Sequence, residues 1–447
     1  MHDQPLVAGF RCAVCGAVVD VARAQPWHCP NDRGDRHHVL HIVPAPTPVR
    51  RWYADADPFV AFGPHLAWWA FARANGMTAD ACAALSRAVG AEVATVAGAG
   101  FQTTPFARAD ALSDALGFTA DGGVWVKDET NQVGGSHKGR HLYTILLHLR
   151  AAELLGMAPW KAANERPRLA IASCGNAAIA AATLAAASHW PLDVFVPEWA
   201  DAAVLALLAD LHATVTRCPR LDDDPPGDPA LHRFREAVAA GSVPFTVQGP
   251  ENALCLDGGR TLGWEIAEQW PGASGGRPTT LDRLFVQVGG GALASSVGAA
   301  LGMTAVRPRL HAVQAQGCAP FDRAWRRAGD VPGGRAASGA HWAQCMTPWV
   351  NPHSAADGIL DDEAYDWLGV VEALGSAGSP IVVPESLVIE AAELGPLTTG
   401  IDASPTGTAG LAGLLAARRD VDDGECVAVV FSGVRRAQPR GSATSIS

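Results

Sequence analysis

The sequence lacks a run of lysines and arginines, and its formal net charge is −11. An acidic chain without a basic patch offers no electrostatic footprint to a nucleic-acid backbone or an anionic membrane surface, so we expect neither partner. The longest apolar run, residues 176–188, is shorter than the roughly 20 residues that span a bilayer. Residues 1–11 show no positive segment followed by an apolar one, so no secretory signal is predicted and we expect a cytoplasmic protein.

Charged residues and clustered cysteines are both sparse. Charged side chains make up 18% of the 447 residues and apolar ones 48%, which is the composition of a globular protein. The length suits two core domains with an appendage rather than a single core. The ten cysteines are scattered apart from Cys12 and Cys15. In a chain without an export signal, we expect thiols or metal ligands rather than disulfides.

The chain changes character near residue 45. Residues 1–45 are turn-rich, without an amphipathic helix, and a proline-rich linker at 44–48 leads out of them. Beyond it, short apolar runs that are typical of buried parallel strands alternate with alanine- and leucine-rich stretches that are typical of helices. The predicted strands include 124–127, 169–172, 194–196, 284–288, 310–314 and 426–431, and the predicted helices include 177–187, 202–211 and 291–301. This alternation predicts an α/β protein with open, mainly parallel sheets.

Four short motifs carry the candidate chemistry. The first is Gly-Gly-Ser-His-Lys-Gly-Arg at 134–140, between the strand at 124–127 and an apolar helix at 142–149. Free amides at a helix start favour an anion, and Lys138 there could bind a phosphate or form an imine with an aldehyde cofactor. By itself this motif is weak, because a lysine at a helix start is more often only solvated.

The other three motifs also follow predicted strands. Ser-Cys-Gly-Asn-Ala at 173–177 is, alone, equally well explained as a helix cap, and Phe-Ser-Gly at 431–433 is better explained as a plain turn. Val-Gly-Gly-Gly-Ala-Leu at 288–293 is stronger, because three consecutive glycines let backbone amides converge on a phosphate. All four motifs lie at carboxyl ends of strands, where open parallel sheets bind ligands, so their joint occurrence indicates one site.

Together these motifs resemble those of fold-type-II pyridoxal-5′-phosphate enzymes, the tryptophan synthase β superfamily, over residues 95–436. The resemblance implies that Lys138 holds the cofactor as a Schiff base and that Ser432 faces its pyridine nitrogen. It implies a substrate-carboxylate loop at Ser173, Cys174, Gly175 and Asn176, with Asn176 also at the cofactor O3′. It implies a phosphate cradle at Gly289, Gly290, Gly291, Ala292 and Leu293. The family's habit further implies a homodimer or higher homo-oligomer that acts on a small amino acid.

The same resemblance implies a division into three parts. Residues 1–45 would form a zinc-ribbon-like segment. Residues 46–159 and 246–447 would form the large cofactor-binding domain, and residues 160–245 a small mobile α/β domain. Gln314 stands where some relatives place a metal-binding glutamate, so no magnesium ion is expected.

Two branches of the family compete. The glycine-rich motif, the Ser432-Gly433 pair and Ala-Asp-Gly-Ile at 356–359 resemble threonine and serine ammonia-lyases, and Gly358 is expected to contact substrate. We therefore expect β-elimination from a hydroxy amino acid such as threonine or serine, giving a 2-oxo acid and ammonia. The alternative, favoured by the N-terminal cysteines, is a threonine-synthase-like replacement on an O-phosphorylated amino acid. That reaction needs a second anion site, to which Arg140 and Arg260 could contribute.

Further positions depart from the family pattern, among them Gly139, which replaces the Asp that follows the lysine in threonine synthases. His137 replaces the usual Phe before the lysine, and Ser404 stands where many lyases have Glu. Cys174 stands where many members have a Ser that can face the substrate Cα, so we predict a catalytic role for it beside Lys138. These departures keep open a third hypothesis, a protein that binds the cofactor without turnover, although the retained Lys138 argues against it.

The N-terminal cysteines have zinc-ribbon spacing. Cys12 and Cys15 are followed after thirteen residues by Cys29, and a complete ribbon would have a fourth cysteine where Asp32 stands. Asp32 could supply an oxygen ligand, and His37 or His38 could substitute for it. A ribbon that has lost its metal and serves only for packing is an equally weighted hypothesis. A bound zinc ion would be structural and remote from Lys138.

Overall fold

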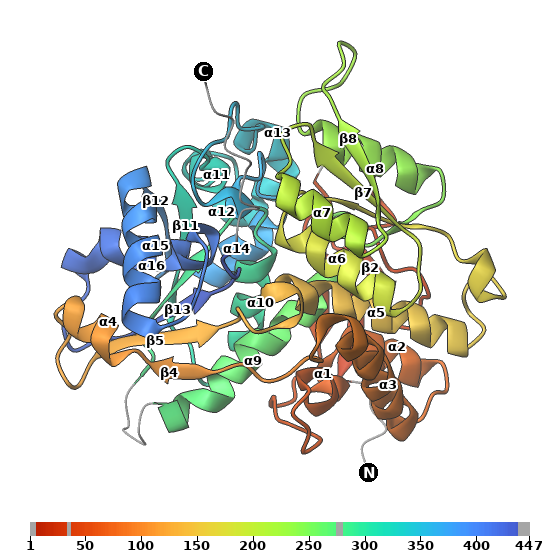
Figure 1. The fold of residues 1–447 in the computed structure, drawn as a ribbon, viewed down its shortest axis with the longest axis horizontal. Helices are drawn as coiled ribbons and strands as arrows, with labels where there is room; N and C mark the ends of the chain where they lie inside the picture. The colour runs from red at the N-terminus through yellow and green to blue at the C-terminus, as the bar shows by residue number, and fades with distance from the viewer. Residues whose placement is uncertain (1–5, 34–36, 274–279, 437–447) are drawn as a thin grey trace, which may run out of the picture.

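The computed structural model describes residues 6–33, 37–273 and 280–436 of the chain (Figure 1). Its strands form a six-stranded sheet, a four-stranded sheet and a small three-stranded sheet near the N-terminus. Helices pack on both larger sheets, so the predicted α/β architecture with mainly parallel sheets is confirmed. Across the described residues, no helix combines the length and apolarity that crossing a membrane would require.

The six-stranded sheet has the order β12-β11-β10-β13-β5-β4, and only the pair of β4 and β5 is antiparallel. Every residue of β5, β10 and β13 is buried, which explains why these strands are continuous apolar runs in the sequence. The strands are β4 (Phe106–Arg108), β5 (Gly123–Asp128), β10 (Arg283–Gln287), β11 (Arg309–Ala315), β12 (Ser379–Val383) and β13 (Cys426–Phe431).

Successive side chains of these strands enter two different hydrophobic cores. Val124 and Val126 belong to one core, whereas Trp125 belongs to the other. The first core lies against α4 (Asp110–Ala115), α15 (Glu385–Thr399) and α16 (Pro405–Ala417). The second lies against α9 (Cys255–Ala273), α10 (Ala292–Leu301) and α14 (Trp367–Leu374). The sheet is therefore covered on both faces, and the loops at its strand ends remain for a site.

The four-stranded sheet is parallel, with the order β8-β7-β6-β9. Its strands are β6 (Leu169–Ala172), β7 (Leu192–Pro197), β8 (Thr214–Cys218) and β9 (Val243–Pro244). The alanine-rich α6 (Asn176–Ala187) is buried almost throughout. It packs against α3 (Ala79–Ala97), α5 (Lys138–Leu154) and α7 (Ala202–Asp210), while α8 (Pro229–Ala239) packs on β6 and β7. Helix α5 also packs against α9, so it joins the two larger sheets.

The three-stranded sheet is antiparallel and consists of β1 (Val7–Cys12), β2 (Val18–Asp20) and β3 (Leu40–Pro44). Phe10 of β1 belongs to the same hydrophobic core as α2 (Ala67–Ala74) and α5. The amide of Ala253 donates to the carbonyl of Trp27 at 3.1 Å. The N-terminal segment therefore packs into the body of the protein, and the three-part domain division stays a prediction. The remaining helices are α1 (Pro58–Ala61), α11 (Pro320–Arg327), α12 (Gly334–Ala337) and α13 (Trp342–Cys345).

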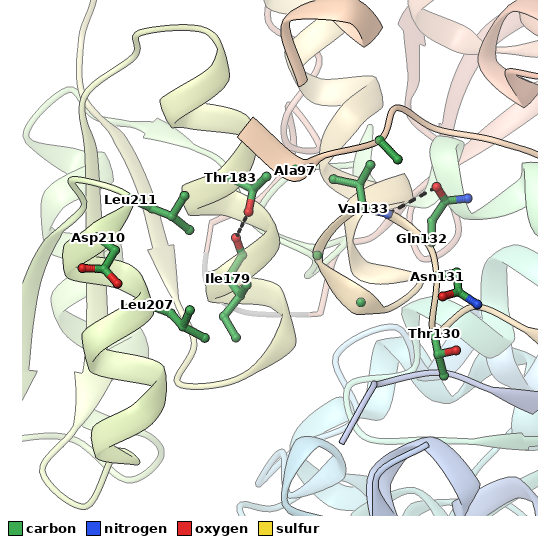
Figure 2. A pocket seen from close by; sticks show the side chains of 13 residues that line it. Ala97, Thr130, Asn131, Gln132, Val133, Ile179, Thr183, Leu207, Asp210 and Leu211 are labelled. Carbon is green, nitrogen blue, oxygen red and sulfur yellow. Dashed lines mark hydrogen bonds between the residues drawn. The ribbon is translucent and has the colours of Figure 1, made fainter. Parts of the chain in front are cut away.

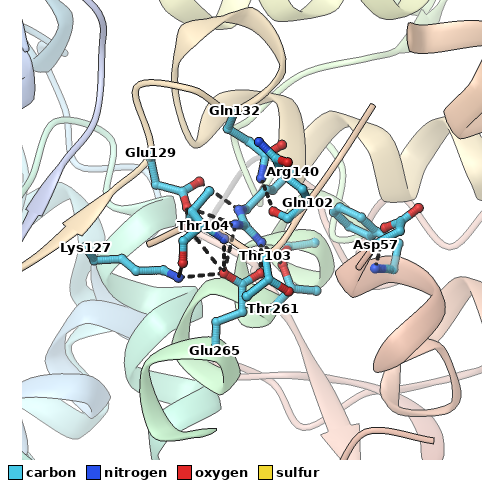
Figure 3. Close-up of polar contacts among 12 residues, drawn as sticks. Asp57, Gln102, Thr103, Thr104, Lys127, Glu129, Gln132, Arg140, Thr261 and Glu265 are labelled. Carbon is cyan, nitrogen blue, oxygen red and sulfur yellow. Dashed lines mark hydrogen bonds and ion pairs between the residues drawn. The ribbon is translucent and has the colours of Figure 1, made fainter. Parts of the chain in front are cut away.

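A buried network of ion pairs joins β5, α5 and α9 (Figure 3). Arg140 of α5 binds Glu129 at 2.7 Å and Glu265 of α9 at 2.6 Å, and Lys127 of β5 binds Glu265 at 2.6 Å. All four side chains are fully buried, and the two cations balance the two carboxylates. Burial lowers the pKa of Lys127 against the opposing pull of Glu265 and Glu129. Burial would raise the pKa of Glu265, but Arg140 and Lys127 hold it below its usual value.

This network makes a stability prediction. Arg140→Met leaves two buried carboxylates without their shared partner, which should cost about 3–5 kcal/mol of folding free energy. Arg150→Met on the same helix removes only partly exposed pairs with Glu92 and Glu153, and should cost under about 1 kcal/mol. Urea denaturation of both variants without added cofactor measures the difference. Equal losses in the two variants would contradict the assigned role of the network.

Candidate active site

Lys138 is positioned by a glycine turn after β5. Gly134 and Gly135 have φ values of 76° and 72°, a backbone conformation that residues with a side chain rarely adopt. A Cβ at Gly135 would lie 2.5 Å from Val434 Cγ1, and the Val434 amide donates to the Gly135 carbonyl at 2.9 Å. The turn thus packs against the segment that follows β13. Helix α5 begins at Lys138 itself.

Among the lysines of the chain, Lys138 is the best candidate for a reactive amine. The chain has three lysines, of which Lys127 is held in the buried ion pairs and Lys161 is exposed. Burial of the Lys138 amine lowers its pKa, while Asp361 and Asp366 pull in the opposite direction. The amine therefore loses its proton more readily than an ordinary lysine does.

Ser432 follows β13 and is buried beside the lysine turn. Its hydroxyl accepts the backbone N–H of His137 at 2.9 Å, and its Oγ lies 2.6 Å from His137 Nδ1. Because β13 and β5 are neighbours in the sheet, the residue after one and the turn after the other meet at the same edge. The structure thus brings Ser432 to the residue adjoining Lys138.

The glycine-rich loop follows β10, the other neighbour of β13. Gly291 has a φ of 99° and caps α10, which begins at Ala292 and whose first amides have no acceptor within the helix. The amide of Gly290, however, donates to Asp361 Oδ2 at 2.7 Å. A Cβ at Gly289 would lie 2.3 Å from the same oxygen. A carboxylate of the chain therefore contacts the glycine-rich loop, and the role of this loop as a phosphate cradle stays a prediction.

Two aspartates beside this loop, the half-buried Asp361 and the buried Asp366, were missed by sequence analysis. Burial raises the pKa of Asp361 to about 6, although Lys138 and the Gly290 amide lower it. Burial likewise raises the pKa of Asp366 to about 7. The Asp366 amide donates to the Gly290 carbonyl at 2.7 Å, and its carboxylate accepts the Gly249 amide at 3.1 Å. The sequence signal was the acidic run Asp-Asp-Glu at 361–363, which a solvated loop explains equally well.

The loop at 173–176 follows β6 in the four-stranded sheet, and α6 begins at Asn176. Burial raises the pKa of the half-buried Cys174 to about 12, with Asp357, Asp228 and Asp361 adding to the effect. Its thiol therefore keeps its proton at neutral pH. Asp361 raises the pKa of both Cys174 and Lys138, so the loop at 173–176 and the lysine both lie near this one carboxylate.

Arg436 is a further site residue that sequence analysis missed. Its guanidinium donates to Asn176 Oδ1 at 2.5 Å and to the Gly134 carbonyl at 2.8 Å. The Asn176 carbonyl oxygen is therefore engaged, and its amide nitrogen is left to face another group. Nothing in the motif at 431–433 signals an arginine three residues later that returns to the site.

The segment around Gly358 closes the other side of the glycine-rich loop. The Gly358 amide donates to Thr406 Oγ1 at 2.9 Å, and that hydroxyl donates to Asp357 at 2.9 Å. A Cβ at Gly289 would lie 2.9 Å from Ile359 Cα, so the two segments are in close contact. Ser404 caps α16 by accepting the Gly407 amide at 3.2 Å, which gives it a structural role.

The N-terminal cluster contains three cysteines and one histidine. Ligand atoms of Cys12, Cys15, Cys29 and His38 all lie within 4.8 Å of one another. Cys12 Sγ lies 3.4 Å from His38 Nδ1, and Cys15 Sγ lies 3.5 Å from Cys29 Sγ. The structure therefore favours His38 as fourth ligand over Asp32. The sequence alone left His38, His37 and Asp32 open because spacing does not show which of these side chains lies beside the cysteines.

A separate cavity of about 350 Å³ lies behind the lysine turn (Figure 2). Residues 130–135 form one wall, and side chains of α6 and α7, including Ile179, Thr183 and Leu207, form the other. Neither Lys138 nor Ser432 lines it. The candidate site is therefore the set of loops after β5, β13, β10 and β6, and not this cavity.

Comparisons with known proteins agree with this arrangement. The sequence model of a family described as pyridoxal-phosphate dependent enzyme matches residues 98–433. A sequence search of curated proteins found no match. Among solved structures, serine racemase from maize is similar with a TM-score of 0.58 and 17% identity, over 79% of this chain and 93% of that one. Threonine deaminase isoform 2 from Solanum lycopersicum is similar with a TM-score of 0.57 and 18% identity, over 81% of this chain and 92% of that one. An O-ureido-L-serine synthase is similar with a TM-score of 0.53 and 18% identity, over 77% of this chain and 91% of that one. At these identities the structural likeness shows the shared fold alone.

The position of Asp361 leads us to predict how strongly the protein binds pyridoxal phosphate. An ionised carboxylate at the Gly290 amide should oppose a phosphate group there by about 1 kcal/mol, so Asp361→Asn should bind pyridoxal phosphate about fivefold more tightly at pH 8. At pH 5 the two proteins should converge, because Asp361, with a pKa of about 6, is then itself mostly protonated. Absorbance titration of the apoprotein measures both affinities.

Asp362→Asn is the matched control for this titration. Asp362 accepts the Tyr365 hydroxyl at 2.8 Å and does not bond to the glycine-rich loop. A gain in affinity of the same size in this control, or a gain in Asp361→Asn that persists at pH 5, would contradict the assigned role of Asp361.

Proposed function

Since the chain belongs to the fold-type-II family of pyridoxal-phosphate-dependent enzymes, we propose that it is an ammonia-lyase for a hydroxy amino acid such as threonine or serine. The observation that carries this proposal is the buried hydroxyl of Ser432 beside the lysine turn. The proposal also rests on the glycine-rich loop after β10 and on the lowered pKa of Lys138.

The residues fit the cofactor. The cradle at 289–293 offers helix-start amides to a phosphate, and close contacts at Gly289 explain why no side chain is present there. Lys138 would hold the cofactor covalently, Ser432 would face its ring nitrogen, and Asn176 would present its amide nitrogen to O3′. When bound, pyridoxal phosphate supplies a sink for the electrons left behind when the substrate loses its Cα proton.

Lys138 would act as the base. An amine with a lowered pKa is neutral for a larger fraction of the time near pH 7, so it can accept the Cα proton of the substrate. The substrate carboxylate would bind the backbone amides of residues 173–176 at the start of α6, a twelve-residue helix. Cys174, whose pKa is about 12, would stay a thiol and offer a hydrogen to the substrate rather than accept one.

Ser432 determines which reaction is favoured. A hydroxyl can donate to an unprotonated ring nitrogen but cannot neutralise a protonated one, as a carboxylate would. A hydroxyl at this position, in place of a carboxylate, would therefore favour loss of the β-hydroxyl over reprotonation at other carbons. Water leaves in the elimination and returns when the carbon–nitrogen bond is hydrolysed. Threonine would thus give 2-oxobutanoate and ammonia, and no oxidant is needed.

The synthase alternative is weakened by where its arginines lie. Arg140 is committed to Glu129 and Glu265, and Arg260 binds Asp257 at 2.5 Å and the His65 carbonyl at 2.7 Å. The expectation that they could bind a substrate phosphate is therefore wrong. Arg436, which lies beside Asn176, is a cation that a replacement reaction on a phosphorylated amino acid could use. A racemase is a further alternative, because the structural neighbours include a serine racemase and racemisation also begins with removal of the Cα proton.

A substrate screen tests the proposal. Protein loaded with pyridoxal phosphate should release 2-oxo acid from L-threonine or L-serine, and Lys138→Ala should lose this activity and the absorbance of the covalent link. Lys161→Ala, which removes an exposed lysine, is the matched control and should retain both. Threonine and phosphate formed only from O-phospho-L-homoserine would establish the synthase instead. Formation of the D-amino acid without 2-oxo acid would establish a racemase. Cofactor binding without any turnover would favour the binding protein.

We further propose that Cys12, Cys15, Cys29 and His38 bind a structural zinc ion. Three thiolates and one imidazole are a standard tetrahedral zinc set, and four protein ligands leave no position open for catalysis. Three of the four side chains are buried, so the ion would lie within the fold. It would link the antiparallel sheet to Cys29 and His38.

Metal analysis of purified variants tests this site and its fourth ligand. The intact protein should contain about one zinc per chain, and Cys15→Ser and His38→Asn should contain less and melt at lower temperature. Asp32→Asn should keep its zinc. Loss of zinc in Asp32→Asn with retention in His38→Asn would make the aspartate the ligand. Well under one zinc per chain in the intact protein would leave a metal-free packing lobe.

A further inference from the structure

His137 and Ser432 form a close contact, and the proposed elimination assigns no role to His137. Both residues are buried, with 8% and 1% of their surfaces exposed. The Ser432 oxygen is 2.9 Å from the His137 backbone nitrogen and 2.6 Å from its Nδ1. Within the described structure, both partners of this hydroxyl therefore come from one residue, the neighbour of Lys138.

The hydrogen-bonding capacity of Ser432 is limited. A hydroxyl can accept two hydrogen bonds and donate one. The His137 backbone N–H must donate, so it takes one of the two lone pairs. The bond to Nδ1 then takes either the second lone pair, when Nδ1 carries the hydrogen, or the hydroxyl's only proton, when it does not. The tautomer of His137 decides what remains for a third group.

The two arrangements give the Ser432 hydroxyl opposite hydrogen-bonding roles toward a ring nitrogen placed against it. If Nδ1 carries the hydrogen, both lone pairs are used, and the hydroxyl can only donate to an unprotonated nitrogen. If Nδ1 is bare, the hydroxyl proton points to it, and the remaining lone pair can accept from a protonated nitrogen. His137 and Ser432 thus form a relay that couples the histidine tautomer to the charge of the ring.

The surroundings favour the first arrangement. Burial lowers the pKa of His137 well below its ordinary value, and Lys138, His141 and Arg140 add to this, so the imidazole is neutral. A positively charged ring would stand near the charge of Arg140, which also acts on His137, with a hydroxyl rather than a carboxylate to balance it. His141, whose ring centre is 5.5 Å from that of His137, donates its own Nδ1 hydrogen to the Cys255 carbonyl at 2.8 Å.

We propose that His137 is a positioning residue that donates from Nδ1 to Ser432 and thereby turns the hydroxyl proton toward the ring nitrogen, keeping that nitrogen unprotonated. This inference deepens the proposed function, because it rests on Ser432 facing the ring. It explains a use for the histidine that stands where relatives usually have phenylalanine. It also assigns the preference for elimination to a pair of residues rather than to Ser432 alone.

Nitrogen NMR of the holoenzyme with ring-¹⁵N pyridoxal phosphate tests the proposal without any substrate. The intact protein should show an unprotonated ring nitrogen. In His137→Phe one lone pair of Ser432 is released, so the ratio of protonated to unprotonated ring should rise about fivefold or more, the effect of one ordinary hydrogen bond. His137→Asn can place an amide N–H near the former Nδ1 and should restore the intact signal.

His141→Asn is the control for losing a neutral imidazole nearby, and its nitrogen signal should match that of the intact protein. A protonated ring in the intact protein would overturn the proposal, as would an unchanged ratio in His137→Phe. An Asn variant that behaves like the Phe variant would also overturn it, because the hydrogen bond would then not be the cause. The signal is read without amino acid, so a failed lyase assay and a failed relay are separate results.

Discussion

The buried ion pairs of Arg140 and Lys127 are the constraint on which the site depends. Replacing such a network by apolar side chains can leave stability unchanged, whereas removing one partner is costly, so its main effect is to fix geometry. Its members come from the segments that build the site. Arg140 lies two residues after Lys138, Glu129 follows β5, and Glu265 lies on α9, which packs against α10. Because these charges must meet in a water-free space, α5 has one register against β5 and α9, and Lys138 is held at the strand ends.

The same network distinguishes the surroundings of Lys127 from those of Lys138. Lys127 contacts Glu265 at 2.6 Å and donates to the Thr104 carbonyl at 2.7 Å, so its charge is matched although burial opposes it. The carboxylates that act on Lys138 are Asp361 and Asp366, whose own pKa values are raised to about 6 and about 7 by burial. These groups favour the neutral form more than a surface aspartate does, so they compensate the amine only weakly near neutral pH. The charge of Lys138 is thus compensated less than that of Lys127, which lies eleven residues earlier in the chain.

The sequence predicted the elements and strand ends well because both depend on local pattern. Predicted strands at 169–172 and 426–431 coincide with β6 and β13, and the helix predicted at 202–211 differs from α7 by one residue. The loops carrying Lys138, Gly289 and Ser432 meet because β5, β13 and β10 are neighbours. What escaped prediction depends on contacts between distant residues. The His137–Ser432 bond spans 295 positions and the Arg436–Asn176 bond spans 260, and no spacing in the sequence encodes either. Arg140, considered for a substrate phosphate, shows the converse error, because an arginine near a motif does not reveal that its partners are already in the core.

The glycine-rich loop shows how a segment with little chemistry of its own is held by distant parts of the chain. Asp366 donates its amide to the Gly290 carbonyl, and the preceding residue, Tyr365, offers its own carbonyl to His37 Nε2 at 2.6 Å. The ring of His37 stacks on Trp342 with centres 3.8 Å apart, and its neighbour His38 belongs to the Cys–His cluster. A short series of contacts therefore runs from the cluster to the cradle, although the two lie about 250 residues apart in sequence. A backbone of three consecutive glycines has high conformational entropy, so it needs neighbours that hold it in place. The N-terminal segment, which sequence analysis treated as an appendage, is one of these neighbours.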